Sequence, residues 1–129
     1  MKVCKIDHLV LTVKDVEATL SFYEKVLGME RVYFGDGRVA LLFGQQKINL
    51  HASGHELEPK AARPAPGSAD LCFITELPLD EAMRHVASKD VEIIKGPVTR
   101  TGARGKLLSF YFRDPDGNLI EVANALTSE

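Results

Sequence analysis

The chain has 129 residues, is 45% hydrophobic and 26% charged, and carries a formal net charge of −2. This length suits one domain with a sizeable core, and the charge gives no general support for a nucleic-acid or anionic-membrane partner. No apolar run near the start is long enough for a membrane span or a signal peptide. Cys4 and Cys72 lie far apart with no CxxC pair. We therefore expect reduced thiols and a cytoplasmic protein.

The first half of the chain predicts one helix and four strands. β-Branched residues predict a strand over residues 4–13. Asp15 is placed to cap a helix, and Gly28 to end it. Three short strands follow, separated by glycine-containing turns: residues 30–34, 38–43 and 47–52. Residues 53–67 contain three prolines and are predicted to form a linker or a loop over a site.

The second half repeats this order. The pattern predicts a strand over residues 68–75 and a helix opened by Pro78, with a strong turn at Asp114–Gly117. The other predicted strands are residues 91–98, 106–112 and 118–124. The order β-α-β-β-β thus occurs twice, in a first module over about residues 4–52 and a second over about 68–125. One helix covers one face of each sheet, so the other face lines a core or a cavity.

Glu121 lies within an otherwise apolar predicted strand, where burying a carboxylate is costly unless something pairs with it. When "DHLVLTV" is aligned with "ADLCFIT", His8 falls on Asp70; when "INLHA" is aligned with "LIEV", His51 falls on Glu121. Four side chains of types that can bind metals then occupy two equivalent positions in the repeat. Strand alternation predicts that the faces bearing them look into the hollow of the sheet.

Two stretches, "IDHLVLTVKDVEATLSFYEKVLGME" and "FYFRDPDGNLIEV", resemble the vicinal oxygen chelate superfamily. Glyoxalase I, the fosfomycin-resistance thiol transferases, the extradiol dioxygenases and the bleomycin-resistance proteins belong to it. The resemblance covers nearly the whole chain as a single domain, residues 1–129. It implies an α+β fold in which two βαβββ modules form a curled mixed sheet of half-barrels around a metal-binding cavity, with the helices outside.

In that family, the first and last strands of each module supply the ligands of a divalent metal. The resemblance implies that His8, His51, Asp70 and Glu121 hold Zn²⁺, Ni²⁺, Fe²⁺, Co²⁺ or Mn²⁺, and that Glu121 is also the catalytic residue. The metal then acts as a Lewis acid on a substrate with two oxygen donors. Extradiol chemistry normally uses two His and one carboxylate, so a fourth ligand argues mildly against it. Asp70 departs from the family, which often has His here.

The segment from Lys95 to Ser109 is basic and glycine-containing, and it is either a mobile flap for an anionic group or a solvated loop. Cys72 shares the predicted face of Asp70 and either borders the site or packs in the core. The residues predicted to bind the substrate are Ser109, Tyr111, Arg113, Arg104 and Arg100. Tyr111 matches a tyrosine that contacts the phosphonate in the fosfomycin-resistance enzymes.

Other interpretations remain open for the predicted ligands. Glu121 and His8 could form a hydrogen-bonded core pair without metal. His51 could be a solvent-exposed residue at a strand end, and Asp70 a cap at a strand start. Thr12 and Val10 stand where glyoxalase I and the fosfomycin enzymes carry an Arg and a Thr, so neither of those substrates is supported.

Taken together, the resemblance implies a metal-dependent, glyoxalase-like isomerase or lyase that acts on a small oxygenated, anionic molecule. The alternatives are a non-catalytic protein that sequesters a small molecule, as in antibiotic resistance, or a thiol transferase or extradiol dioxygenase of the same superfamily. We also expect a homodimer whose sites are shared between chains. His8 and His51 would come from one chain, and Asp70 and Glu121 from its partner.

Overall fold

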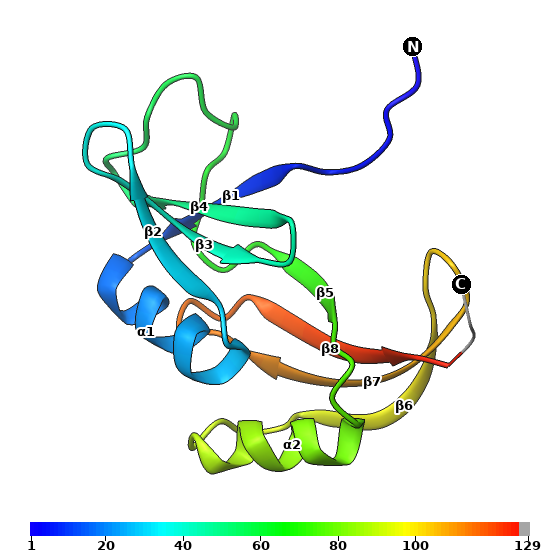
Figure 1. Ribbon diagram of the computed structural model, residues 1–129. Helices are drawn as coiled ribbons and strands as arrows, with labels where there is room; N and C mark the ends of the chain where they lie inside the picture. Colours follow the sequence, from blue (N-terminus) through cyan, green and yellow to red (C-terminus); the bar gives the residue numbers. More distant parts are fainter. Residues whose placement is uncertain (127–129) are drawn as a thin grey trace. The chain divides into compact units, whose positions relative to one another are not determined.

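The computed structural model describes residues 1–126, which divide into two compact units, the first Met1–Gly67 and the second beginning at Ser68. Each unit contains one helix and one four-stranded mixed sheet (Figure 1), and neither sheet is a closed barrel. The predicted α+β class and the twofold β-α-β-β-β order are therefore confirmed. The boundary between the units falls where the predicted linker ends.

The first unit has the strand order β1-β4-β3-β2. Among neighbouring strands, only β1 and β4 are parallel. Helix α1 carries the chain from β1 to β2 at the other edge of the sheet, and two antiparallel pairings then lead back to β4 beside β1. The elements are β1 (His8–Val13), α1 (Val16–Leu27), β2 (Glu30–Phe34), β3 (Arg38–Phe43) and β4 (Gln46–Ala52).

Helix α1 begins and ends where the sequence predicts. Asp15 has extended backbone angles, and its Oδ1 accepts a hydrogen bond from the Ala18 amide at 3.0 Å. Gly28 takes the left-handed conformation with φ 67° and donates its N–H to the Glu24 carbonyl. Leu20 and Tyr23 are buried on the inner side of the helix. This side covers the sheet face formed by Leu11, Val13, Leu41, Ile48 and Leu50, all at most 6% exposed.

The second unit has the equivalent strand order, β5-β8-β7-β6, with β5 and β8 parallel. Helix α2 has no side-chain hydrogen bond at its N-cap, which is Pro78. Its buried residues include Leu79 and Val86, and the sheet contributes fully buried rings from Phe110 and Phe112. The elements are β5 (Asp70–Ile74), α2 (Leu79–Ser88), β6 (Lys95–Thr101), β7 (Lys106–Arg113) and β8 (Leu119–Ala125).

Two predicted strands differ from the structure by three residues or more at an end. β1 begins at His8 rather than at residue 4, because His8 pairs with Lys47 near the start of β4 and the chain before it has no ladder partner. β6 runs over Lys95–Thr101 rather than 91–98, because it must pair with β7 as far as Lys106. Much of the predicted basic loop is therefore strand, and the tip between β6 and β7 is only residues 102–105.

A bulge between Lys95 and Val98 contains Gly96 and Pro97, consistent with the confinement of proline to bulges and edge strands. Gly96 has φ 127°, and a Cβ at this position would lie 2.5 Å from the Cβ of Phe110. No side chain fits there while β6 lies against β7 in this register. Glycine is therefore required at this point of the edge strand.

The predicted turn at residues 114–117 is confirmed, and its side chains organise it. Asp114 Oδ1 accepts hydrogen bonds from the amides of Asp116 and Asn118, and its Oδ2 accepts one from Asn118 Nδ2 at 2.8 Å. Asn118 Oδ1 in turn accepts the Ala69 amide at 2.9 Å. The turn thereby fixes the start of β5 beside the start of β8.

Candidate functional site

The face of the second sheet opposite helix α2 carries the predicted substrate-binding residues. Strand pairing places Cys72, Glu121 and Tyr111 side by side across β5, β8 and β7. The neighbouring row on this face consists of Asp70, Leu119 and Arg113. Ser109 lies in the row on the other side of Tyr111 and Glu121. Ser109, Tyr111 and Arg113 therefore share a face of the sheet with Glu121. We call this surface the open face of the second sheet.

Basic side chains lie along the same open face. Arg100 Nε donates a hydrogen bond to the Tyr111 hydroxyl at 2.8 Å, and its guanidinium carbon lies 5.5 Å from the centre of the Tyr111 ring. Arg113 Nη1 donates to the Gly117 carbonyl at 3.2 Å. Because Arg100 is held by an acceptor on a sheet residue, its guanidinium group is oriented and can bind an anion with its other N–H groups.

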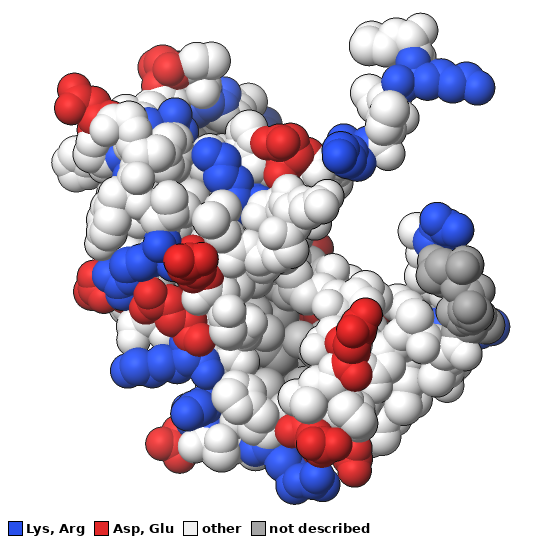
Figure 2. All heavy atoms as spheres, viewed as in Figure 1, with Lys and Arg blue, Asp and Glu red and all other residues white. Residues whose placement is uncertain are grey.

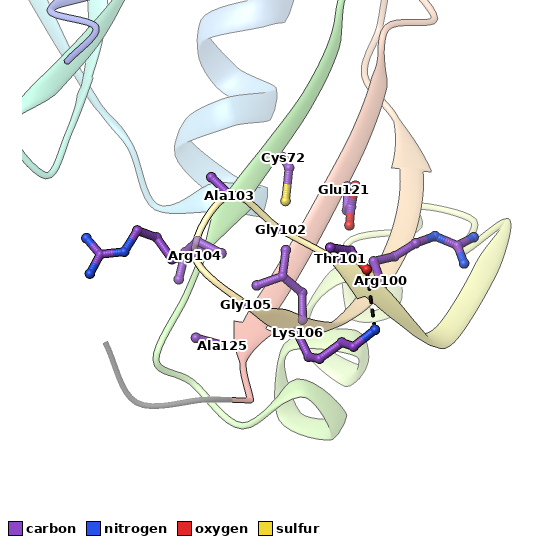
Figure 3. A pocket seen from close by; sticks show the side chains of 12 residues that line it. Cys72, Arg100, Thr101, Gly102, Ala103, Arg104, Gly105, Lys106, Glu121 and Ala125 are labelled. Atoms are coloured by element: carbon purple, nitrogen blue, oxygen red, sulfur yellow. Dashed lines mark hydrogen bonds between the residues drawn. The ribbon is translucent and has the colours of Figure 1, made fainter. Parts of the chain in front are cut away.

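Two cavities open on this face, and both include Arg100 and Glu121 in their walls. One, of about 470 Å³, is also lined by Asp70, Lys95, Tyr111 and Arg113. The other, of about 460 Å³, lies beneath the tip between β6 and β7 and is also lined by Cys72, Ile74, Leu107 and Ala125 (Figure 3). Cys72 therefore borders a cavity, and the sequence alternative of a packed core cysteine is wrong: its side chain is exposed.

Glu121 affects the acidity of the neighbouring Cys72 thiol. Partial burial, together with the charge of Glu121 and a hydrogen bond to it, raises the pKa of the Cys72 thiol to about 11. Cys72 is therefore protonated near neutral pH, and it is a poor nucleophile in this state. Figure 3 shows both side chains pointing into the same space. The Glu121 carboxylate thus has a proton donor beside it, but no cation on the adjacent strand β5.

The predicted flap residues differ in position. Arg100 lies on β6 beside Tyr111, whereas Arg104 lies on the exposed tip and its guanidinium points away from the other labelled residues (Figure 3). Ser109 is fully buried, and its hydroxyl has no hydrogen-bond partner within residues 1–126. The structure thus brings Arg100, Tyr111 and Arg113 together and leaves Arg104 at the margin.

In the first unit, His8 starts β1 on the sheet face opposite α1. Its Nδ1 lies 2.9 Å from Asp7 Oδ2, and its side chain is 44% exposed. Nε2 has no hydrogen-bond partner in the part of the chain that the structure describes. A carboxylate at one ring nitrogen favours the tautomer whose other nitrogen has a free lone pair, which is the usual arrangement of a metal-binding histidine.

The strand registers correct the predicted alignment of His51 with Glu121. Glu121 pairs with Cys72, which is the counterpart of Val10 in the repeat, and Val10 pairs with Asn49. The counterpart of Glu121 is therefore Asn49. Residue-by-residue matching of the two last strands missed this because it had no partner strand to fix the register.

His51 lies four residues beyond the partner of His8, or roughly 13 Å along the strand. Its side chain is therefore too far from His8 for both imidazoles of one unit to reach one ion comfortably. His51 is 9% exposed, so the alternative of a solvent-exposed histidine is wrong. Its buried Nε2 and the buried Oδ1 of Asn49 both lack a hydrogen-bond partner among the described residues.

The donor set fits a divalent metal in part. Asp70 and Glu121 are diagonal neighbours on adjacent strands, with Cα atoms roughly 8 Å apart, so both carboxylates can reach one ion. Within residues 1–126, however, no three His, Cys, Asp or Glu side chains are grouped to hold a metal ion. Two carboxylates alone leave a metal site with few protein ligands, so a metal bound here would need further donors.

Charge on the visible surface is mixed rather than gathered in one field. Figure 2 shows acidic and basic side chains intermingled over the face in view. Among the helices of residues 1–126, none has the length and apolar character needed to cross a membrane. Local charge on the open face of the second sheet is therefore the more informative signal for a ligand.

Comparison with known proteins agrees with this architecture. The family model described as "Glyoxalase/Bleomycin resistance protein/Dioxygenase superfamily" matches residues 5–122. The virulence protein STM3117 of Salmonella typhimurium is 55% identical over 123 residues, which are 95% of this chain and 85% of that protein. Its crystal structure superposes with a TM-score of 0.96, covering 98% of this chain and 100% of that one.

Two further solved structures are informative. An integron cassette protein from V. cholerae is 63% identical, with a TM-score of 0.95 and coverage of 96% of this chain and 97% of that one. The fosfomycin resistance protein FosX from Listeria monocytogenes, solved as a point mutant with Mn(II) and 1S,2S-dihydroxypropylphosphonic acid, is 23% identical. It has a TM-score of 0.65 and covers 97% of this chain and 94% of that one, a likeness of fold. The chain belongs to the glyoxalase/bleomycin resistance protein/dioxygenase superfamily.

Proposed function

We propose that this protein is a metal-dependent enzyme of the glyoxalase type, an isomerase or lyase, and that it acts on a small oxygenated anion. The observation that carries this proposal is the composition of the open face of the second sheet. Asp70 and Glu121 lie within reach of one ion, and Arg100, Tyr111 and Arg113 lie beside them. A site with a metal and fixed cations favours a substrate that is both a chelator and an anion.

Three side chains are proposed as metal ligands: Asp70, Glu121 and His8. Asp70 and Glu121 supply oxygen donors from one sheet, and His8 supplies Nε2 from an imidazole already hydrogen-bonded to Asp7. For the fourth position the registers favour Asn49, because it is the counterpart of Glu121 and its Oδ1 is buried without a partner among residues 1–126. His51 remains a prediction with less support.

A bound divalent ion would polarise a substrate oxygen and stabilise the negative charge that develops on it. The side chains of the chain do the rest. Arg100 and Arg113 orient the anionic end of the substrate, and the Tyr111 hydroxyl, held by Arg100, is placed to donate a hydrogen bond. Glu121 is proposed to move the substrate proton, since it is a carboxylate on the same face and only partly exposed.

The relatives support the metal and the small-molecule ligand. The FosX structure, which shares the fold, contains Mn(II) and a phosphonic acid. We propose one of Zn²⁺, Ni²⁺, Fe²⁺, Co²⁺ or Mn²⁺ as the metal of this chain, since nitrogen and oxygen donors suit all five. We also propose a homodimer in which His8 comes from one copy and Asp70 and Glu121 from the other. Sedimentation at micromolar concentration tests this, and a monomer would rule it out.

Metal content and chelator sensitivity of the melting temperature test the proposed function. Glu121→Gln keeps the side-chain shape but removes the charge. Metal affinity should therefore fall at least as much as it does when a residue that hydrogen-bonds to a metal ligand is changed, roughly 10–100-fold. Wild-type protein should melt at a lower temperature in chelator, because a ligand bound only to the folded state stabilises it. Glu121→Gln and His8→Ala should respond much less.

Asn49→Ala and His51→Ala decide the fourth ligand, because only the true ligand should lower metal affinity. Thr99→Ala, on the exposed opposite face of β6, is the matched control and should behave as wild type. If wild type and all variants are equally insensitive to chelator and contain no metal, the enzyme proposal fails. A protein that sequesters a small molecule then becomes the favoured function.

A further inference from the structure

The open face of the second sheet changes character along its strands. At one end, Asp70 and Arg113 lie in the same row across the sheet; at the other end, Leu107 pairs with Ala125. Ile74 extends the apolar end on β5 and is 58% exposed, which is high for a large aliphatic side chain. The open face therefore becomes more apolar toward Ile74, Leu107 and Ala125, although Arg104 and Lys106 line the same cavity.

The two cavities follow the same division. The polar cavity, of about 470 Å³, has Lys95, Arg113 and Tyr111 in its walls, and the apolar cavity, of about 460 Å³, has Ile74 and Leu107. Arg100 and Glu121 belong to both, so the cavities adjoin at these two residues. A single small molecule lying across Glu121 would place one end in each cavity.

The charges of the polar cavity favour an anion at that end. Lys95, Arg100 and Arg113 carry three positive charges against the two negative charges of Asp70 and Glu121. Arg100 is positioned by Tyr111 and by the Thr99 carbonyl, which accepts a hydrogen bond from Arg100 Nη1 at 3.3 Å. A carboxylate matches the flat guanidinium group of Arg100 in two parallel hydrogen bonds.

The apolar cavity favours an aliphatic group. Its walls include side chains without hydrogen-bonding groups, those of Ile74, Leu107 and Ala125, and Arg104 and Lys106 also line it. Gly102 at the tip approaches Leu107 closely, since a Cβ there would lie 2.8 Å from Leu107 Cδ1. The tip thus closes over Leu107 and gives the cavity a cover made largely of small residues, as Figure 3 shows for Gly102, Ala103 and Gly105.

We infer that the substrate class is a small carboxylate with a short aliphatic tail. The carboxylate lies between Arg100, Lys95 and Arg113, the tail lies against Ile74 and Leu107, and the central atoms lie over Glu121. This inference deepens the proposed function and rests on it for the identity of the reacting atoms, but the two-ended binding surface belongs to the protein whether or not a metal is present.

The test measures binding of a homologous series of probes to the full chain by calorimetry or amide chemical shifts. The probes are acetate, butanoate and hexanoate, with hexylammonium as the charge-reversed control, each in EDTA and again with Mn²⁺. Affinity should rise roughly fourfold for each methylene that enters the apolar cavity. Hexylammonium should bind much more weakly than hexanoate because it meets three cations.

Two variants separate the ends of the surface. Arg100→Gln should weaken all three acids by a similar factor, roughly tenfold or more, since it removes a charged hydrogen-bond donor. Leu107→Asn should abolish the gain from acetate to hexanoate and leave acetate binding unchanged. Thr99→Ala is the control for both, and circular dichroism checks folding.

The inference is overturned if hexanoate binds no more tightly than acetate with and without Mn²⁺, if no acid binds, or if hexylammonium equals hexanoate. It is also overturned if Leu107→Asn keeps the dependence on chain length. Failure of the proposed function has a different signature, in which metal is absent and chelator has no effect while the acids still bind in EDTA.

Discussion

The two units have the same topology but different chemistry on their open faces. The registers match Glu121, Tyr111 and Arg113 of the second unit with Asn49, Ala40 and Leu42 of the first. On the helix-facing side the residues stay apolar in both, with Phe112 matching Leu41. The comparison teaches that helix-facing positions stay apolar in both units, whereas open-face positions differ, with Lys47 of the first unit in the place of Leu119 of the second.

The largest expected effect tests the helix-facing side. Phe112 and its counterpart Leu41 are both fully buried. Phe112→Ala should lower the free energy of unfolding by about 3–5 kcal/mol and Leu41→Ala by about 2–5 kcal/mol, because each leaves a cavity. Urea denaturation measures both, with the exposed Thr99→Ala as the control. A loss below about 1 kcal/mol for either would show that its helix-facing side is not the core of that unit.

The next effect concerns the turns that precede the last strand of each unit. Asp114→Ala removes three hydrogen bonds in the second unit, two of them to backbone amides, and should cost about 1–3 kcal/mol. The matching turn of the first unit contains Gly44 and the exposed Gln45. Gln45→Ala should change stability by less than about 0.5 kcal/mol. Equal effects in denaturant titrations would contradict this difference between the units.

A smaller effect is expected at the helix starts, where α1 has a side-chain cap and α2 has none. Asp15→Ala should lower stability by about 1 kcal/mol, since the Ala18 amide loses its acceptor. Asp36→Ala, in an exposed turn of the same unit, is the matched control for the loss of one negative charge. If the two variants have the same melting temperature, the cap contributes nothing measurable.

The smallest expected effect is a difference between the units in how their stability depends on pH. Hydrogen bonds from Arg31 lower the pKa values of Glu17 and Glu24 below their ordinary value of 4.5. Depressed carboxylate pKa values stabilise the folded state above 4.5, and this stabilisation is lost as the pH falls through the folded pKa values. Wild type should therefore exceed Arg31→Gln in stability at about pH 6, and the difference should shrink toward about pH 3.

Arg84→Gln is the counterpart in the second unit, where Arg84 Nη1 lies 3.6 Å from Asp80 Oδ2 and both side chains are exposed. Its stability difference from wild type should be close to zero throughout, because exposed pairs contribute little. Thermal melts at several pH values measure both variants. A pH-independent difference for Arg31→Gln would contradict the role of its two partners.

The fold was predictable because its signals are local. Asp15 and Gly28 mark the ends of α1, and residues 114–117 form a turn whose sequence defines its type. Strand bounds were less predictable, since they depend on partners: β1 begins where β4 can pair with it, and β6 extends to Thr101 to follow β7.

The site was predictable where alternation alone decides it. Ser109, Tyr111 and Arg113 share a face because they are two residues apart on one strand. The equivalence of Asn49 to Glu121 was not predictable, because only the pairing of Val10 with Asn49 reveals it. The apolar cavity was missed because Ile74 and Leu107 look like core residues in the sequence.

The close approach of β6 to β7 at Gly96 also limits how the protein can vary. A Cβ there would meet the Cβ of Phe110 at 2.5 Å and its backbone at 2.7 Å, and neither can move far without opening the sheet that carries Tyr111. In a saturation scan of this chain, position 96 should therefore reject even alanine. The residues of the nearby tip, where Ala103 is exposed, should accept many replacements. The size of the apolar cavity can thus be changed by substitutions at residues 103 and 104 without disturbing the strand that holds Arg100.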